Sequence, residues 1–202
     1  MNMTEVSGLN NWSADNVWLD AAGQLHLKLS HSQGKWYAAE LYSTEKLGFG
    51  TYQWYVTGCV DKLDKNVVLG LFPYLGPDGQ NEIDIEMAHW GSAGRPVGNW
   101  TVWPAAGGIV RATHPFAVSL SGDDSTQRVN WQSQAIVFQM LQGHRSDDGA
   151  EIARWTFSPD RDLDLIPQQP MPVAMNLWLY QGVVPSDGKE VEIVVKDISY
   201  TP

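Results

Sequence analysis

The chain alternates apolar and polar positions over short stretches, which is the period of a β-strand. Residues 24–29 read Gln-Leu-His-Leu-Lys-Leu, and a strand turns successive side chains to opposite faces. Together with Val17–Asp20 and the turn at 21–23, this pattern predicts a hairpin. Val67–Tyr74 is instead a nearly continuous apolar run, which favours a strand covered on both faces.

Further strands are predicted along the whole chain, and turn residues separate them. They lie at residues 48–56, 82–87, 100–103, 127–131, 135–141, 152–157, 173–179 and 190–200. No stretch combines a helical period with helix caps. Many short strands with turns between them are typical of an all-β protein, either a two-sheet antiparallel β-sandwich or a barrel. Because no linker or repeat divides the chain, we expect a single domain over residues 1–202.

The strand predicted at residues 82–87 carries three acids in one row. Glu82, Asp84 and Glu86 alternate with apolar residues, so the acids share one face and the apolar side chains share the other. Such crowding opposes folding, and it forces neighbouring carboxyl pKa values apart, so that one group is charged while another holds a proton. Acid–base catalysis uses this arrangement. A solvated acidic edge and a calcium site are the alternatives, although calcium prefers oxygens that converge from a loop.

Composition narrows the class of ligand. The formal net charge of −10 argues against nucleic acid, which is bound by clustered Lys and Arg, and favours a neutral ligand.

No apolar run approaches the ~18 residues of a membrane span, and Met1–Asn11 lacks the features of a signal peptide. The single cysteine, Cys59, excludes an internal disulfide. The ten tryptophans either fill the core or form flat platforms on which sugar rings stack.

A family resemblance rests on the acidic strand and on three other segments. Asn81-Glu82-Ile83-Asp84-Ile85-Glu86 resembles the active-site strand of glycoside hydrolase family 16, the family of licheninases, laminarinases and xyloglucan-modifying enzymes. The family's upstream strand and glycine turn are resembled by residues 36–43 followed by 48–52, its late NLW segment by 175–178, and its last strand by 194–202, so the resemblance covers most of the chain. The unbulged E-x-D-x-E spacing is similar to that of licheninases and xyloglucan enzymes. Tyr42 stands where the family commonly has Arg.

The resemblance implies a fold and a chemistry. The fold is a curved, two-sheet jelly roll of the concanavalin-like type, with a substrate cleft across its concave face. The chemistry is retaining hydrolysis with Glu82 as the nucleophile, Asp84 as its assistant and Glu86 as the acid/base. The resemblance also implies secretion or action outside the cytoplasm. No cofactor is required, although Asp197 matches an acid that helps to bind structural calcium in some relatives; a plain surface aspartate is the alternative.

Five further residues are candidates for substrate binding. Glu40 matches a cleft-lining position of the family. Asn176 and Trp178 share one face of a strand and combine an amide for hydroxyl groups with an indole for stacking. Trp103 and Trp90 are placed to flank the cleft. The alternatives are ordinary: a surface acid, a solvent-facing amide, and tryptophans packed in the core.

These observations predict an endo-acting, retaining glycosidase that cleaves internal β-glycosidic bonds of a neutral polysaccharide. The substrate we expect is a β-glucan with mixed β-1,3-1,4, β-1,3 or β-1,4 linkages, and the protein is expected to be a monomer without nucleic-acid or membrane partners. Two alternatives remain open. One is a transglycosylase that transfers the glycosyl group to a sugar, and the other is a non-catalytic glycan-binding module on the same sandwich.

Overall fold

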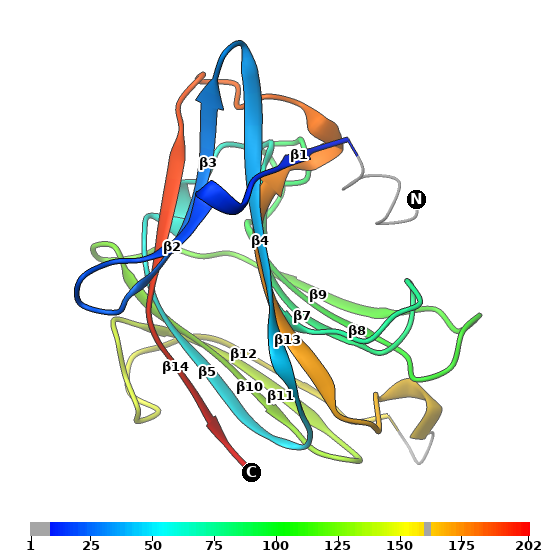
Figure 1. The fold of residues 1–202 in the computed structure, drawn as a ribbon. Helices are drawn as coiled ribbons and strands as arrows, with labels where there is room; N and C mark the ends of the chain where they lie inside the picture. Colours follow the sequence, from blue (N-terminus) through cyan, green and yellow to red (C-terminus); the bar gives the residue numbers. More distant parts are fainter. Residues whose placement is uncertain (1–8, 160–162) are drawn as a thin grey trace.

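The computed structural model describes residues 9–159 and 163–202, and β-strands dominate these residues (Figure 1). The strands are β1 (Asn11–Trp12), β2 (Val17–Leu19), β3 (Leu25–Ser32), β4 (Lys35–Leu47), β5 (Gly50–Thr57), β6 (Val67–Pro73), β7 (Glu82–Ala88), β8 (Gly98–Trp103), β9 (Ala112–Phe116), β10 (Asp124–Trp131), β11 (Ile136–Gln142), β12 (Glu151–Phe157), β13 (Met171–Leu179) and β14 (Val191–Thr201). Short 3-10 helices follow at η1 (Ala14–Asn16), η2 (Val60–Lys62), η3 (Leu163–Leu165) and η4 (Tyr180–Gly182). No helix in the described ranges is long and apolar enough to cross a membrane.

The described strands belong to one hydrogen-bonded sheet. Its path runs β12-β11-β10-β5-β14-β3-β4-β13-β6-β7-β8-β9, with β1 attached to β4 and β2 attached to β3. The strand pairs along this path are antiparallel, and β1 pairs with β4 in parallel. The prediction of an all-β, antiparallel protein is therefore confirmed. Two separate sheets are expected from the sequence, but the tip of the β3–β4 hairpin joins the strands into one path through the pairs Ser30–Tyr37, His31–Trp36 and Ser32–Lys35.

The path folds over, so that its two ends face each other. We call β3, β14, β5, β10, β11 and β12 the back half, and β4, β13, β6, β7, β8 and β9 the site half. The rings of Trp100 in β8 and Phe138 in β11 stack with centroids 5.5 Å apart, and those of His114 in β9 and Trp155 in β12 stack at 5.3 Å. Figure 1 shows the halves as facing layers. The apolar side chains between them form one hydrophobic core cluster.

Strand β7 turns its two faces to different surroundings, as its alternation predicts. Ile83, Ile85 and Met87 expose 1% of their surface or less and belong to the core. The acids therefore lie on the opposite face of the site half. Strand β6, beside β7, is buried along its whole length, which confirms the prediction made from its continuous apolar run.

Strand β9 is absent from the strands predicted above, and Pro115 explains why. Proline lacks the N–H group that a central strand needs and is confined to sheet edges, strand starts or bulges. β9 is the last strand of the path and pairs on one side with β8. Its free side therefore tolerates proline, which the local sequence alone does not reveal.

The aromatic stack between the halves yields a stability prediction. Phe138→Ala should lower the free energy of unfolding by about 3–5 kcal/mol, because it removes a fully buried ring and leaves a cavity beside Trp100 and Trp155. Thr156→Ala is the matched control, since this exposed residue lies on the neighbouring strand β12. Chemical denaturation measures both changes. Equal effects of the two substitutions would contradict the assigned core.

Candidate active site

The three acids occupy the middle of the site half, on β7 between β6 and β8. The β7–β8 register places Glu82 opposite Trp103, Asp84 opposite Thr101 and Glu86 opposite Asn99. On the other side, Gly70 of β6 lies opposite Glu86. Glu82, Asp84 and Glu86 expose only 7%, 1% and 5% of their surface. Neighbouring side chains on the same face therefore enclose the acids, which do not form a solvated edge.

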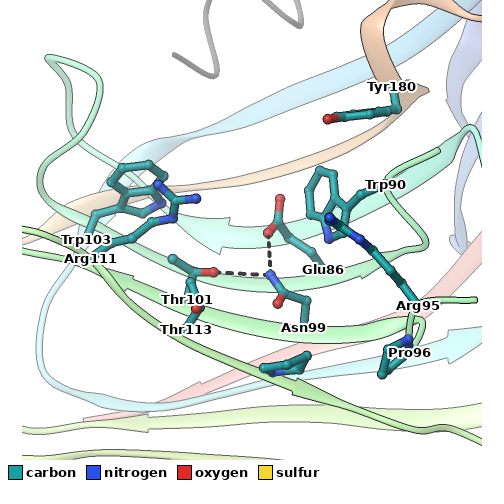
Figure 2. A pocket seen from close by; sticks show the side chains of 11 residues that line it. Glu86, Trp90, Arg95, Pro96, Asn99, Thr101, Trp103, Arg111, Thr113 and Tyr180 are labelled. Atoms are coloured by element: carbon teal, nitrogen blue, oxygen red, sulfur yellow. Dashed lines mark hydrogen bonds between the residues drawn. The ribbon is translucent and has the colours of Figure 1, made fainter. Parts of the chain in front are cut away.

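Hydrogen-bond donors on β8 reach two of the acids. The indole Nε1 of Trp103 donates to Oδ2 of Asp84 at 2.8 Å. The amide Nδ2 of Asn99 donates to Oε2 of Glu86 at 3.2 Å and also lies 3.2 Å from Oγ1 of Thr101 (Figure 2). The carboxyl groups of Asp84 and Glu82 also hydrogen-bond to each other. One of these two carboxyls must carry a proton, because ionised carboxylates only accept hydrogen bonds.

Burial and mutual repulsion keep protons on the acidic row. Burial, reinforced by the charge of Glu86, raises the pKa of Glu82 to about 8, although the hydrogen bond from Asp84 opposes the rise. Burial also raises the pKa of Asp84 and of Glu86 well above the ordinary values, and the negative charge of the adjacent acid adds to it. The positive charge of Arg111 acts in the opposite direction on both groups. The three acids therefore do not all ionise near neutral pH.

A pocket of about 430 Å³ opens beside Glu86. Figure 2 shows Glu86 in its centre, with Trp103 and Arg111 on one side and Trp90 and Arg95 on the other. The described residues that line it are Glu86, Trp90, Arg95, Pro96, Asn99, Thr101, Trp103, Arg111, Thr113, Pro115 and Tyr180. The pocket thus combines aromatic rings with amide, hydroxyl and guanidinium donors.

Two contacts fix the aromatic side chains of this pocket. Trp90 and Tyr180 meet edge to face, with centroids 5.5 Å apart and an interplanar angle of 75°. The guanidinium carbon of Arg111 lies 4.5 Å from the centroid of the Trp103 ring, within the range of a cation–π interaction. Trp103 therefore contacts Arg111 through its ring and Asp84 through its N–H group.

A second polar group lies on the other side of β7, on β4 and β13. Asn176 is opposite Glu40 in the β13–β4 register and opposite Gly70 in the β13–β6 register. Glu40 is hydrogen-bonded to Asn176 and Tyr42, and burial raises its pKa. A Cβ atom on Gly70 would lie 2.5 Å from Oδ1 of Asn176. The absence of a side chain at Gly70 therefore makes room for the amide.

Tyr42 and Tyr74 extend this second group toward Glu82. Burial raises the pKa of both phenols, and the negative charges of Asp78 and Glu82 contribute to the shift. The hydroxyl of Tyr74 donates to Oδ1 of Asp78 at 2.6 Å. Tyr42 thus lies near the acids and is 48% exposed. It stands at the position where glycoside hydrolase family 16, which the sequence resembles, commonly has Arg.

The sequence-predicted residues fall into three groups. Trp90 and Trp103 line the pocket, together with Glu86. Glu40 and Asn176 share the acid-bearing face through the strand register. Trp178 also lies on that face but is 2% exposed and belongs to the hydrophobic core cluster. That burial matches the core-packing alternative, so Trp178 offers no open platform to a sugar ring.

The calcium candidate remains a prediction. Asp197 is exposed on β14, and its Oδ1 accepts a hydrogen bond from the backbone N–H of Ile198 at 2.9 Å. In the described ranges, no three His, Cys, Asp or Glu side chains gather as metal ligands would. Asp197 therefore has no group of such ligands around it within the described residues.

Sequence reasoning missed six polar or aromatic residues of the pocket. Asn99 and Thr101 could have been predicted, because they share a strand face with Trp103 under the two-residue period. Thr113 lies on β9, which was not predicted. Arg95, Arg111 and Tyr180 lie outside β-strands, where no periodicity specifies which side chains converge.

Comparison with solved structures identifies the same fold in several β-glucanases. The β-glucanase of Bacillus licheniformis matches with a TM-score of 0.70 and 21% identity, over 96% of this chain and 85% of that chain. A β-1,3-1,4-glucanase (lichenase) derived from a mouse hindgut metagenome matches with a TM-score of 0.66 and 24% identity, over 95% and 85% of the two chains.

A third match has a different description. The Mycobacterium tuberculosis protein described as an immunostimulatory antigen and pseudo β-1,3-glucanase has a TM-score of 0.69 and 19% identity, over 94% of this chain and 80% of its own. No family model and no curated protein matches the sequence. At these identities the likeness concerns the fold, and we conclude that this chain adopts the jelly-roll fold of the β-glucanases.

Proposed function

We propose that this protein is a retaining, endo-acting glycoside hydrolase that cleaves internal β-glycosidic bonds of a β-glucan. The observation that carries the proposal is the buried row of Glu82, Asp84 and Glu86 beside a pocket lined by Trp90 and Trp103. Retaining glycosidases require two carboxyl groups, one charged and one protonated. Aromatic rings beside such a pair provide faces on which sugars stack. The fold of the structural neighbours agrees with this assignment but does not by itself establish an activity.

The contacts of the acids suggest how the protons are distributed. Asp84 keeps its proton and donates it in a hydrogen bond to Glu82, which favours the charged form of Glu82. The indole N–H of Trp103 donates to Oδ2 of Asp84 and orients that carboxyl. Glu86 exposes only 5% of its surface, and burial favours the neutral form of its carboxyl group. A neutral Glu86 also removes the negative charge that contributes to the raised pKa of Glu82. Glu82 is therefore assigned as the nucleophile and Glu86 as the general acid.

The reaction follows in two steps. Glu86 protonates the glycosidic oxygen as the carbon–oxygen bond breaks, while a carboxylate oxygen of Glu82 attacks the anomeric carbon. Glu86, now ionised, takes a proton from a water molecule whose oxygen attacks the same carbon, and Glu82 leaves as a carboxylate. A sugar hydroxyl in place of water would give transglycosylation with the same residues. Asn176 and Glu40 are assigned to bind sugar hydroxyls on the other side of β7.

A non-catalytic glycan-binding module is the second candidate. The observation that favours it is that one structural neighbour is described as a pseudo β-1,3-glucanase. A binding module would retain glycans without releasing new reducing ends. The substitutions below distinguish these cases when glycan binding and product release are measured together.

Substitution of the acids tests the central assignment. Glu82→Gln and Glu86→Gln should each lower kcat on a soluble mixed-linkage β-glucan by at least about a hundredfold, because each removes a proton-transfer or nucleophilic group. Reducing-end release measures the loss, and thermal melting should show a folded protein. Glu45→Gln, on the exposed part of β4, is the control. Unchanged turnover in either acid variant would remove the assignment, whereas binding without turnover in the unmodified protein would favour the second candidate.

Trp103→Phe tests the link between the indole and Asp84. It retains an aromatic ring but removes the N–H donor, which leaves Oδ2 of the buried Asp84 carboxyl without this partner at a cost of about 1–3 kcal/mol. We expect kcat to fall by about tenfold or more, with a smaller change in KM. A change confined to KM would instead assign Trp103 to sugar stacking alone.

The raised pKa of Glu86 predicts how stability depends on pH. Above its ordinary pKa of 4.5, the native state retains on Glu86 a proton that the unfolded chain has lost. The free energy of unfolding should therefore decrease as pH rises above this value, by up to about 1.4 kcal/mol per pH unit for one proton. Glu86→Gln should flatten this dependence in urea denaturation series at pH 5, 6, 7 and 8. Parallel curves for the two proteins would contradict the proton assignment.

A further inference from the structure

The charges around the acidic row are distributed unevenly. Among the described arginines, Arg128, Arg145 and Arg154 form ion pairs with Asp148, Asp147 and Glu151, respectively. Arg95 and Arg111 form no ion pair with any described residue, and both line the pocket beside Glu86. The described arginines that form no ion pair are thus the two that line the same pocket.

The two guanidinium groups approach the pocket from opposite walls. Figure 2 shows Arg111 beside Trp103 on one side of Glu86, and Arg95 beside Trp90 on the other. The cation–π contact of Arg111 with Trp103 limits the conformations of a side chain that is otherwise exposed. A guanidinium group that is already oriented loses less conformational freedom when it binds an anion.

The remaining polar side chains of the pocket are amide or hydroxyl groups. Asn99, Thr101, Thr113 and Tyr180 line it, and Glu86 is the one acidic residue among the described residues of the lining. The opposite side of β7 has the reverse character, because Glu40, Asp78 and Glu82 act there on the phenols of Tyr42 and Tyr74. The local charge therefore changes sign across the acidic row, from negative on the Glu82 side to positive on the Glu86 side.

We propose that the pocket beside Glu86 binds an anionic group of the glycan, either a carboxylate or a sulfate ester, between Arg95 and Arg111. Arginine recognises both anions because its planar fork donates paired hydrogen bonds to their oxygens. The overall charge of −10 favours a neutral ligand. Salt, however, screens interactions between exposed charges that are more than about 8 Å apart at physiological ionic strength. The nearby arginines therefore decide the preference of this subsite. The inference rests on the proposed function only in taking the ligand to be a glycan.

A simpler role for Arg111 makes a different prediction. Its charge lowers the pKa of Asp84 and Glu86, and it could serve only to offset these acids. Removal of Arg111 would then affect neutral and anionic glycans alike, and Arg95, which contributes to neither shift, would have no effect. The ratio of the two affinities separates the two roles.

The experiment compares three ligands that differ in one substituent. They are a β-1,3-1,4-glucan oligosaccharide, the same oligosaccharide oxidised at C6 to uronic acid, and the same oligosaccharide sulfated at C6. Calorimetric titration of the full chain carrying Glu82→Gln measures binding without turnover. We expect one anionic ligand to bind about tenfold more tightly than the neutral one, and the stronger of the two identifies the anion. Added NaCl should reduce this preference.

Arginine substitutions in the same background locate the subsite. Arg95→Gln and Arg111→Gln should each remove most of the anionic preference, whereas Arg154→Gln, which removes an arginine charge from the back half, should preserve it. Equal affinities for the neutral and anionic ligands, a preference that survives both pocket substitutions, or no binding of any ligand would overturn the proposal. An anionic preference in this background, together with no hydrolysis of any of the three ligands by the unmodified protein, would overturn the proposed function and leave the subsite standing.

Discussion

The burial of three carboxyl groups on one strand face is the constraint around which the site half is organised. An isolated buried charge is so unfavourable that the group changes its protonation instead. Here Asp84 and Glu82 hydrogen-bond to each other, Trp103 donates to Asp84, and Asn99 donates to Glu86. The neighbouring strand β8 therefore carries the side chains that make the acidic strand tolerable. The same contacts give each carboxyl a different environment, which is the condition for different chemical roles.

The core supports this arrangement from beneath. The apolar face of β7 packs against residues of the hydrophobic core cluster. The stacked rings of Trp100, Phe138 and Trp155 connect the two halves of the sheet. Close packing of this kind resists small displacements. An acidic row on a loop would relax away from its own repulsion, whereas a row on a strand anchored by Ile83 and Ile85 cannot move without disturbing the core.

The sequence predicted features that a repeating pattern encodes. Alternation placed the acids of β7 on one face and the isoleucines on the other, and the continuous apolar run identified β6 as buried. Patterns failed for β9, because proline argues against a central strand but is allowed at the sheet edge, where Pro115 lies. They also failed for Arg95, Arg111 and Tyr180, which reach the pocket from segments without periodicity. Burial of Trp178 depends on what covers it, which the strand's own residues do not specify.

Gly70 restricts how this surface can diversify. It lies between Glu86 and Asn176 in the sheet register, and even a methyl group there would collide with the amide. The floor at this point is backbone, so it has no side chain whose size or polarity could be adjusted in small steps. Side chains that can adjust ligand preference lie instead in the walls of the pocket, among them Trp90, Arg95 and Arg111. A substitution at these positions changes the surface that meets the ligand while the backbone that carries the acids stays in place.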